Sequence, residues 1–278
     1  MKSFEKKYAV LLFTLCSIVF FLSHEDSSSL AAVDTQIAVP EKITLTVVTH
    51  PQPQGRYDYI EIIDSCTSDF EGNCLYAYSG PGVKYEKLYE LRNGMLFKIK
   101  TKEERNGQVW YRVHFDEQLR YPDRVEGDWY IPAVVGRIIT DNGEQLLTSL
   151  TPETSKRIII DLSDHMIYAY DGNMLFLTTK VSTGVSSAPT PIGIFTIYKK
   201  TPSRYMQGPI PGVTEVPFDL PGVSWNMYFT QDGAVIHGAY WHDRYGTNQS
   251  SGCINLPPEL AKILYDWVDV GTQVVVEK

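Results

Sequence analysis

The sequence lacks an excess of positive charge. Its 278 residues carry 25 Lys and Arg against 33 Asp and Glu, a formal net charge of -8. Proteins that hold nucleic-acid phosphates by counterion release present basic surfaces, so we expect no nucleic-acid partner. A disorder-prone composition is also missing, because 43% of the residues are hydrophobic. A chain of this length and composition can build two modest domains, each with a core of its own.

Long apolar runs are missing as well, except for one near the N-terminus. Lys2, Lys6 and Lys7 precede a largely apolar run over residues 8–22, which is typical of an export signal. The run is short for a membrane-spanning helix, which needs about 20 apolar residues. We predict that residues 1–32 form a signal peptide or an N-terminal anchor, the only membrane contact expected, and that the protein is exported to the cell envelope. A buried core helix is the alternative, but such a helix would show a polar face.

Cysteine is rare, with four in the whole chain. Cys16 lies inside the apolar run and is interpreted as an apolar filler. Cys66 and Cys74 stand close together in DSCTSDFEGNC, where an exported protein can hold a local disulfide. A metal site is the alternative, but no second Cys or His pair at zinc-like spacing accompanies them, and we predict no metal. Cys253 is then left without a partner, and an unpaired thiol in an exported protein is a candidate reactive group.

Helical periodicity is scarce in the first half of the chain. Over residues 57–135, runs of β-branched and aromatic residues alternate with Gly, Asn and Pro turns at short intervals, which predicts a small all-β unit. SGPG at 79–82, followed by QVWYRV and DWYI, resembles the bacterial SH3-like domain. The resemblance implies a domain that holds or orients cell-wall material; a passive spacer is the alternative. We place this domain, with an extended lead-in and a linker, at residues 33–150.

The second half is also predicted to be mainly β. KRIIID, HMIYAYD and NMLFLTTK read as three strands, the last two joined by a DGN turn, and GIFTIYKK, NMYFT, AVIHG and a final VVV read as further strands. A Gly- and Pro-rich loop is expected over residues 201–222. One amphipathic helix is predicted behind Pro257 and Pro258 from apolar residues at i, i+3, i+4 and i+7, namely Leu260, Ile263, Leu264 and Trp267. Residues 151–278 would therefore form a mostly β catalytic domain with one helix.

The chemistry points to the stretch AVIHGAYWHDRYGTNQSSGCINLPPEL, in which His237 precedes Cys253 and both adjoin glycines. The two residues are too far apart for one helix face, but a strand ending at His237 and a loop returning at Cys253 would bring imidazole and thiol together, as a cysteine nucleophile requires. A neighbouring imidazolium would lower the thiol pKa and give a thiolate near neutral pH. Gly238 and Gly252 would let backbone amides turn toward an oxyanion. A buried structural thiol is the alternative.

These residues resemble the catalytic motif of the L,D-transpeptidase (YkuD-like) family, and the resemblance extends from Arg157 to the C-terminus. It implies that Cys253 is the nucleophile, His237 the general base oriented by a backbone carbonyl such as that of Gly238, and Asn255 an anchor for the donor peptide. It further implies peptidoglycan stem peptides as donor and acceptor, 3-3 cross-links formed through a cysteine thioester, and no cofactor. The matching segments are HG at 237–238, Ser250 with GCIN at 252–255, VSTG at 181–184 and TPIGIFTI at 190–197.

One position departs from the family pattern, because Ser251 stands where the family has a histidine. A hydroxyl can donate a hydrogen bond but cannot carry a positive charge near neutral pH. We therefore expect an active enzyme with an altered rate or donor preference. Trp241 and Tyr240 are expected to form an aromatic wall for the substrate, or else to pack the loop. His242 would line the acceptor side or pair with a neighbouring aspartate.

Several functional alternatives stay open at this point. Transfer to water instead of an amine would make an L,D-carboxypeptidase. An envelope cysteine peptidase or sortase is less compatible, because NlpC/P60-type peptidases place Cys before His, and sortases have a much longer gap between the two. A non-catalytic cell-wall-binding protein would have no use for both His237 and Cys253. No oligomeric state is predicted.

Overall fold

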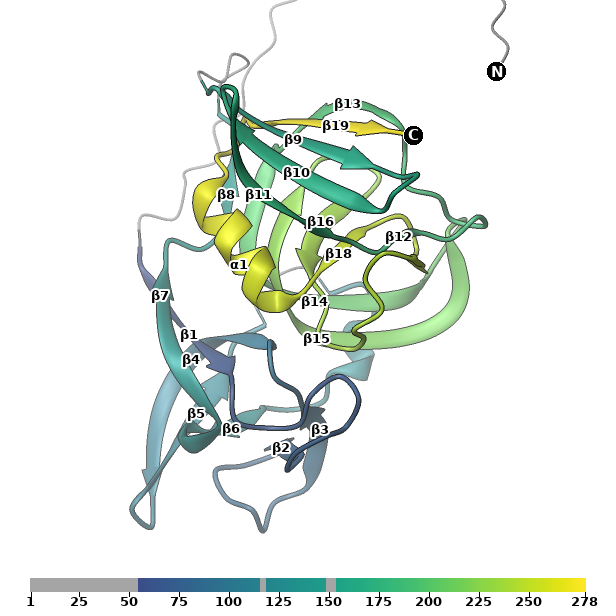
Figure 1. The fold of residues 1–278 in the computed structure, drawn as a ribbon. Helices are drawn as coiled ribbons and strands as arrows, with labels where there is room; N and C mark the ends of the chain where they lie inside the picture. Colours follow the sequence, from purple (N-terminus) through teal and green to yellow (C-terminus); the bar gives the residue numbers. More distant parts are fainter. Residues whose placement is uncertain (1–54, 116–118, 149–153) are drawn as a thin grey trace, which may run out of the picture. The chain divides into compact units, whose positions relative to one another are not determined.

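A computed structural model describes residues 55–115, 119–148 and 154–278. The predicted export signal and Cys16 lie outside these residues. The chain divides into Met1–Val48 and a second compact unit, Thr49–Lys278, to which everything below refers. Within the described residues no helix combines the length and the apolar character needed to cross a membrane. They form a mainly β structure with one α-helix, which confirms the predicted fold class (Figure 1).

Seven strands of the first half form one sheet, here called the N-terminal sheet, with strand order β3-β2-β6-β5-β4-β1-β7. Two short 3-10 turns, η1 (Pro122–Arg124) and η2 (Ala133–Val135), lie between its later strands. Strand β7 pairs with β1 over six residues, although the sequence assigned it to a linker. The strands are β1 (Tyr57–Ile62), β2 (Leu75–Tyr78), β3 (Lys87–Leu91), β4 (Leu96–Arg105), β5 (Gln108–Val113), β6 (Tyr130–Pro132) and β7 (Gly136–Asp141).

The second half contains two five-stranded sheets and one short parallel pair. The first sheet has the order β11-β10-β9-β19-β13, the second β18-β16-β15-β14-β8, and β12 pairs with β17. The strands are β8 (Gln145–Leu146), β9 (Lys156–Asp161), β10 (Met166–Asp171), β11 (Met174–Lys180), β12 (Thr183–Gly184), β13 (Gly193–Thr196), β14 (Lys199–Ile210), β15 (Thr214–Tyr228), β16 (Val235–Gly238), β17 (Asn248–Ser250), β18 (Ile254–Leu256) and β19 (Gln273–Glu277).

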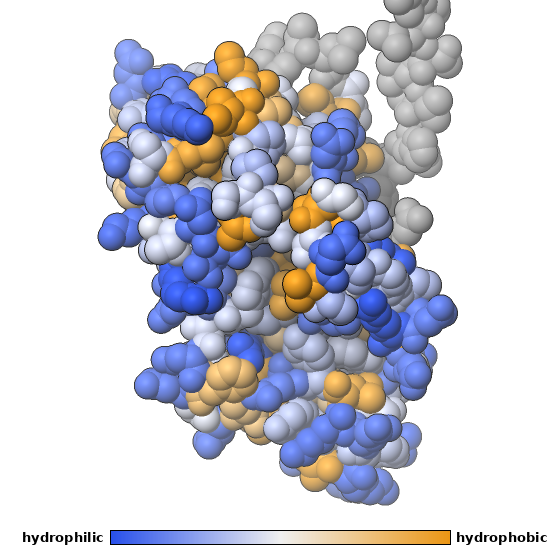
Figure 2. All heavy atoms as spheres, turned by 90° about the vertical axis from the view of Figure 1, so that its right-hand side faces the viewer, coloured by the Kyte–Doolittle hydropathy of each residue, from blue (hydrophilic) through white to orange (hydrophobic). Residues whose placement is uncertain are grey.

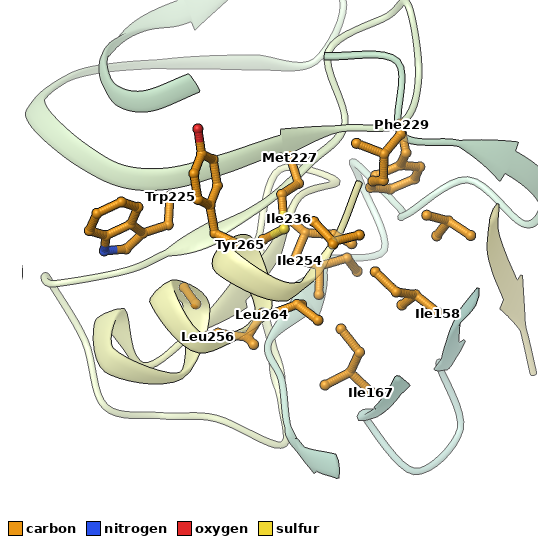
Figure 3. Close-up of a cluster of buried hydrophobic side chains, with 14 of the residues drawn as sticks. Ile158, Ile167, Trp225, Met227, Phe229, Ile236, Ile254, Leu256, Leu264 and Tyr265 are labelled. Atoms are coloured by element: carbon orange, nitrogen blue, oxygen red, sulfur yellow. The ribbon is translucent and has the colours of Figure 1, made fainter. Parts of the chain in front are cut away.

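Helix α1 (Pro258–Trp267) is the helix that the sequence predicted, and it begins at the second of the two prolines. A proline suits the first helical turn because its missing N–H would have no partner there. Ala261, Leu264 and Tyr265 are buried, whereas Ile263, expected on the same face, is 47% exposed. Figure 3 shows that Leu264 and Tyr265 point into a core that also holds Met227, Ile236 and Ile254 from the adjacent strands.

The predicted loop over residues 201–222 is wrong, because this segment forms the long hairpin of β14 and β15. Five prolines motivated that prediction. Proline lacks the N–H that a strand ladder needs and is tolerated only at unpaired or bulged positions. None of the five stands at a paired position, and the two ladder irregularities, at Arg204/Met206 and Gly208/Ile210, absorb part of this stretch. The prolines are Pro202, Pro209, Pro211, Pro217 and Pro221.

The N-terminal sheet and the second half of the chain share their hydrophobic cores. Tyr59 and Leu96 of the N-terminal sheet belong to the cluster that contains Ile236 and Leu264. Val223 and Tyr240 belong in turn to the cluster built on the N-terminal sheet. Gly94 illustrates how close the contact is, because a Cβ built there would stand 2.4 Å from Cγ of Pro258, at the start of α1.

A disulfide joins Cys66 and Cys74 in the connection between β1 and β2. Cys253 is the free cysteine among the described residues. On the face that Figure 2 shows, hydrophobic residues form separate patches among hydrophilic ones.

Candidate active site

Strands β16 and β18 bring the two candidate reactive residues together. They are parallel neighbours in which Ile236 stands opposite Ile254 and His237 opposite Asn255. Ile236 and Ile254 are fully buried in the core. Side chains alternate along a strand, so His237 and Asn255 point to the other face of the sheet, and Cys253, two residues before Asn255, returns to that same face.

The turn before Cys253 is held by Ser250. Its hydroxyl donates to the carbonyl of Cys253 at 2.6 Å and accepts the amide N–H of Gly252 at 3.2 Å. Gly252 has φ 102°, a backbone conformation that residues with a Cβ rarely adopt. The N–H of Gly252 is therefore engaged inside the turn. The glycine contributes the backbone conformation of the turn, and an oxyanion donor here would be another local amide.

Gly238 permits a close approach of three elements. A Cβ at this position would stand 2.7 Å from Oγ of Ser224 in β15 and 3.0 Å from Cα of Pro258. Any side chain here would push β15 or the start of α1 away from His237. The glycine after the histidine is thus required by packing next to the site.

His237 is fixed in one orientation. Its Nδ1 lies 3.0 Å from the carbonyl oxygen of Gly238, and because a carbonyl only accepts, Nδ1 carries the hydrogen. Nε2 is then the ring atom that can accept a proton. The residue is 2% exposed. Burial lowers the pKa of His237 to about 4; the Gly238 carbonyl acts in the opposite direction, and the nearby His242 lowers the pKa further.

Cys253 is a neutral thiol in this environment. Burial raises its pKa to about 11, although a backbone hydrogen bond from Val235 favours the thiolate. With a histidine pKa of about 4, the proton stays on sulfur at neutral pH. Desolvation of the two groups thus acts against the expected thiolate near neutral pH. The residue as a whole keeps partial exposure, which leaves an approach for a substrate.

The structure separates the predicted substrate-binding residues into two groups. Ser251 is exposed beside Cys253, and Trp241 is half-buried with its ring centroid 5.7 Å from that of His237. Asn255 and Tyr240 are 1% and 3% exposed, so both support the site from within, and for Tyr240 this favours packing of the loop over an aromatic wall. The hydroxyl of Tyr240 donates to the carbonyl of Pro221 at 2.8 Å.

His242 pairs with Asn255 and not with the adjacent aspartate. Its Nε2 lies 3.0 Å from Nδ2 of Asn255, and burial lowers its pKa, with Arg244 acting in the same direction and Asp243 against it. Nδ2 only donates, so Nε2 of His242 is unprotonated in this contact. The pair lies next to His237 because Asn255 stands opposite it in the ladder.

A neighbouring segment that the sequence did not assign to the site lies beside Gly252. A Cβ on this glycine would stand 3.5 Å from the carbonyl oxygen of Pro189 and 3.9 Å from that of Ala188. Thr190 holds the segment by accepting the N–H of Gly184 at 2.9 Å. The TPIG sequence marked this region as part of the family pattern, but only the folded chain places it next to the nucleophile turn.

The described residues gather three potential metal-ligand atoms at one place, on Cys66, Cys74 and Glu90. Both sulfur atoms belong to the disulfide. Metals bind the thiolate form of cysteine, so this group does not fit a metal while the disulfide is intact.

Comparison with known proteins identifies the segment that contains this arrangement. Residues 155–276 match the model of the L,D-transpeptidase catalytic domain (YkuD). The matched segment includes β9 to β19 and both His237 and Cys253. The N-terminal sheet precedes it.

Curated relatives agree with this match. L,D-transpeptidase 2 of Mycobacterium tuberculosis is 27% identical over 165 residues, which cover 53% of this chain and 40% of the relative. L,D-transpeptidase 1 of the same species is 30% identical over 122 residues, covering 42% of this chain and 49% of the relative. The chain thus spans less than half the length of these two relatives.

Solved structures give low overall similarity. An L,D-transpeptidase from Mycobacterium smegmatis has a TM-score of 0.43 at 21% identity and covers 62% of this chain and 91% of that one. The catalytic domain of the E. faecium L,D-transpeptidase, determined by NMR, has a TM-score of 0.40 at 28% identity and covers 45% of this chain and 100% of that one.

Proposed function

We propose that this protein is an L,D-transpeptidase that forms 3-3 cross-links between peptidoglycan stem peptides. The observation that carries the proposal is that Cys253, directly before β18, and His237, in the neighbouring parallel strand β16, lie inside the segment that matches the L,D-transpeptidase catalytic domain. Residues 1–32 as export signal, the SH3-like character of the domain at 33–150 and the catalytic domain at 151–278 belong to the same proposal.

In the acylation step, the sulfur of Cys253 attacks the carbonyl carbon of the third, diamino residue of a donor tetrapeptide stem. Nε2 of His237 takes the thiol proton, since Nδ1 is committed to the Gly238 carbonyl. The tetrahedral intermediate collapses, the bond to the terminal D-Ala breaks, and His237 returns the proton to the departing amine. The product is a thioester on Cys253.

In the second step, the side-chain amine of another stem attacks the thioester carbonyl. His237 accepts a proton from this amine and passes it to the departing sulfur, which restores the neutral pair. The new amide bond is the cross-link. Water in place of the amine would give L,D-carboxypeptidase activity from the same acyl-enzyme.

The neutral resting pair determines how attack occurs. With the thiol pKa at about 11 and the imidazole pKa at about 4, proton transfer and attack proceed together, when a bound carbonyl can accept the developing charge. A backbone N–H next to the nucleophile can stabilise the oxyanion of the tetrahedral intermediate by donating a hydrogen bond to it. The N–H of Cys253 is the candidate, because no hydrogen bond found among the described residues engages it.

Mass spectrometry tests the proposal directly. The chain is incubated with a disaccharide-tetrapeptide, and we expect released D-Ala together with a mass increase on Cys253 that corresponds to the acyl-enzyme. Cys253→Ala should abolish both signals, and His237→Gln should abolish D-Ala release while the thiol is retained. A folded wild-type chain that gives neither an adduct nor D-Ala would contradict the proposal. A cross-linked dimer in the same mixture distinguishes transfer from hydrolysis.

A further inference from the structure

Two tyrosines from distant parts of the chain meet at strand β15. Tyr89 of β3 donates its phenol proton to the carbonyl of Asp219 at 3.1 Å. Tyr240, three residues after His237, donates its phenol proton to the carbonyl of Pro221 at 2.8 Å, and its hydroxyl interacts with that of Tyr89. The N-terminal sheet, the β14–β15 hairpin and the loop after His237 are thus joined by one hydrogen-bonded group, here called the tyrosine junction.

A second set of contacts fixes the hairpin to the segment before β6. Arg124 donates to the carbonyl of Gly208 at 2.6 Å and to the carboxylate of Asp219 at 3.2 Å. Gln207, which is 4% exposed, donates to Asp219 at 3.0 Å and to the carbonyl of Tyr121 at 3.0 Å, and its amide oxygen accepts the N–H of Tyr121 at 2.9 Å. Both the oxygen and the nitrogen of this buried amide are therefore hydrogen-bonded across the contact. A loosely attached module would not require such a buried polar contact.

The junction continues to the ring of His237. Tyr240 packs edge-on against Trp241 with ring centroids 5.0 Å apart, and Trp241 lies 5.7 Å from His237. Both Tyr240 and Trp241 belong to the hydrophobic cluster built on the N-terminal sheet. The aromatic ring beside the candidate base is consequently held by a part of the chain that lies outside the matched catalytic segment.

We propose that the N-terminal sheet is a positioning element of the active site, acting through Tyr89 and Tyr240 to hold Trp241 against His237. Tyr89 and Tyr240 are positioning residues, since neither touches the reacting atoms. This role differs from that of a tethered wall-binding module or spacer, because those functions need no shared core with the catalytic segment. The inference rests on the proposed function for its kinetic test, but its structural test does not.

The kinetic test removes one hydroxyl at a time in the full chain. Tyr89→Phe and Tyr240→Phe keep the rings and delete the junction. Tyr85→Phe is the matched control, because Tyr85 lies in the turn between β2 and β3 and is 40% exposed. Loss of a single buried hydrogen bond corresponds to about a 5- to 10-fold change. We expect kcat for D-Ala release to fall by about that factor in both variants, with KM for the donor nearly unchanged, and no change in the control.

A double variant separates a junction from two independent effects. If the two phenols act as one unit, Tyr89→Phe combined with Tyr240→Phe should lose no more kcat than the worse single variant. Multiplied losses, or kcat values within twofold of wild type in folded single variants, would overturn the proposal. Should Tyr240→Phe fail to fold, Arg124→Gln tests the same attachment at a partly exposed position and should lower kcat in the same direction.

The structural test needs no substrate. The His237 ring resonances are followed by NMR, since the adjacent Trp241 ring shifts them according to its position. Tyr89→Phe should move these resonances, although Tyr89 is not in contact with His237, and Tyr85→Phe should leave them in place. Unmoved resonances in Tyr89→Phe would overturn the inference even in an active enzyme. A wild-type chain without D-Ala release, but with the expected NMR shifts, would contradict the proposed function and leave the positioning role intact.

Discussion

The reactivity of Cys253 toward a neutral alkylating reagent reports directly on the state of the candidate catalytic pair. Iodoacetamide reacts with the thiolate and not with the thiol, so its rate follows the thiolate fraction. Burial raises the pKa of Cys253 to about 11 from the ordinary 9.0. At pH 7 the thiolate fraction then falls from about one in a hundred to about one in ten thousand. We expect alkylation about 100-fold slower than for an exposed cysteine.

The assay measures the intact mass of the folded chain after timed exposure to iodoacetamide between pH 5 and pH 11. Cys66 and Cys74 are in a disulfide, and the assay uses a Cys16→Ala chain, so that a single added carbamidomethyl group reports Cys253. The rate should rise about tenfold per pH unit up to about pH 10 without a plateau at neutral pH. The same chain unfolded in urea with its disulfide intact is the reference, and its rate should level off near pH 9.

A different profile would refute the reasoning. A thiolate–imidazolium pair would give a rate that is already constant from about pH 5 to pH 8, as the pair would be ionised throughout this range. His237→Gln provides the matched control. If the wild-type pair is neutral, the alkylation profile of His237→Gln should resemble that of wild type. If the wild-type pair is ionised, the variant should lose the plateau near neutral pH.

Four further predictions concern stability and the turn before the nucleophile. The pKa of His237 is lowered from 6.5 to about 4, so stability present above pH 6.5 should be lost as pH falls toward 4, by about 3 kcal/mol in urea unfolding, and His237→Gln should remove this loss. Gly238→Ala should cost about 1–3 kcal/mol and reduce D-Ala release, because its Cβ overlaps β15; unchanged stability would contradict this packing. Replacing Cys66 and Cys74 by Ala opens a disulfide of sequence separation 8 and should cost about 2.5 kcal/mol without changing kcat. Ser251→His lies on the surface, so it should change turnover or donor choice with less than about 0.5 kcal/mol effect on unfolding; identical kinetics would contradict a tuned site.

The residues that carry the chemistry were accessible from the sequence because they are local. The HG dipeptide and the SGC turn each depend on neighbours a few positions away, and β16 and α1 appear where the pattern predicts them, whereas β18 was not predicted. The protonation state was not accessible. It depends on how deeply His237 and Cys253 are desolvated, and burial arises from contacts with β15 and α1 that no short motif encodes.

The loop predicted over residues 201–222, which is the β14–β15 hairpin, was wrong for the opposite reason. Prolines and glycines are strong local signals for loops, and here tertiary pairing overrides them because every proline falls at an unpaired position. The same limit applies to Tyr240 and Asn255, whose degree of burial no local pattern indicated. Their burial follows from packing against Pro221 and His242, partners that lie 19 and 13 positions away.

If the thiol and the imidazole are both neutral and buried, the reaction depends on how the surrounding residues position the two groups. An ionised pair is held together by its own charges, whereas a neutral thiol and imidazole attract each other only through one hydrogen bond. The ring of His237 must therefore be held by its surroundings, by the Gly238 carbonyl on one side and by Trp241 on the other. Because the N-terminal sheet holds Trp241 through Tyr240, a buried neutral pair and a shared core between the two halves of the chain are parts of one arrangement. Loosening the tyrosine junction should thus lower kcat more than it lowers donor binding.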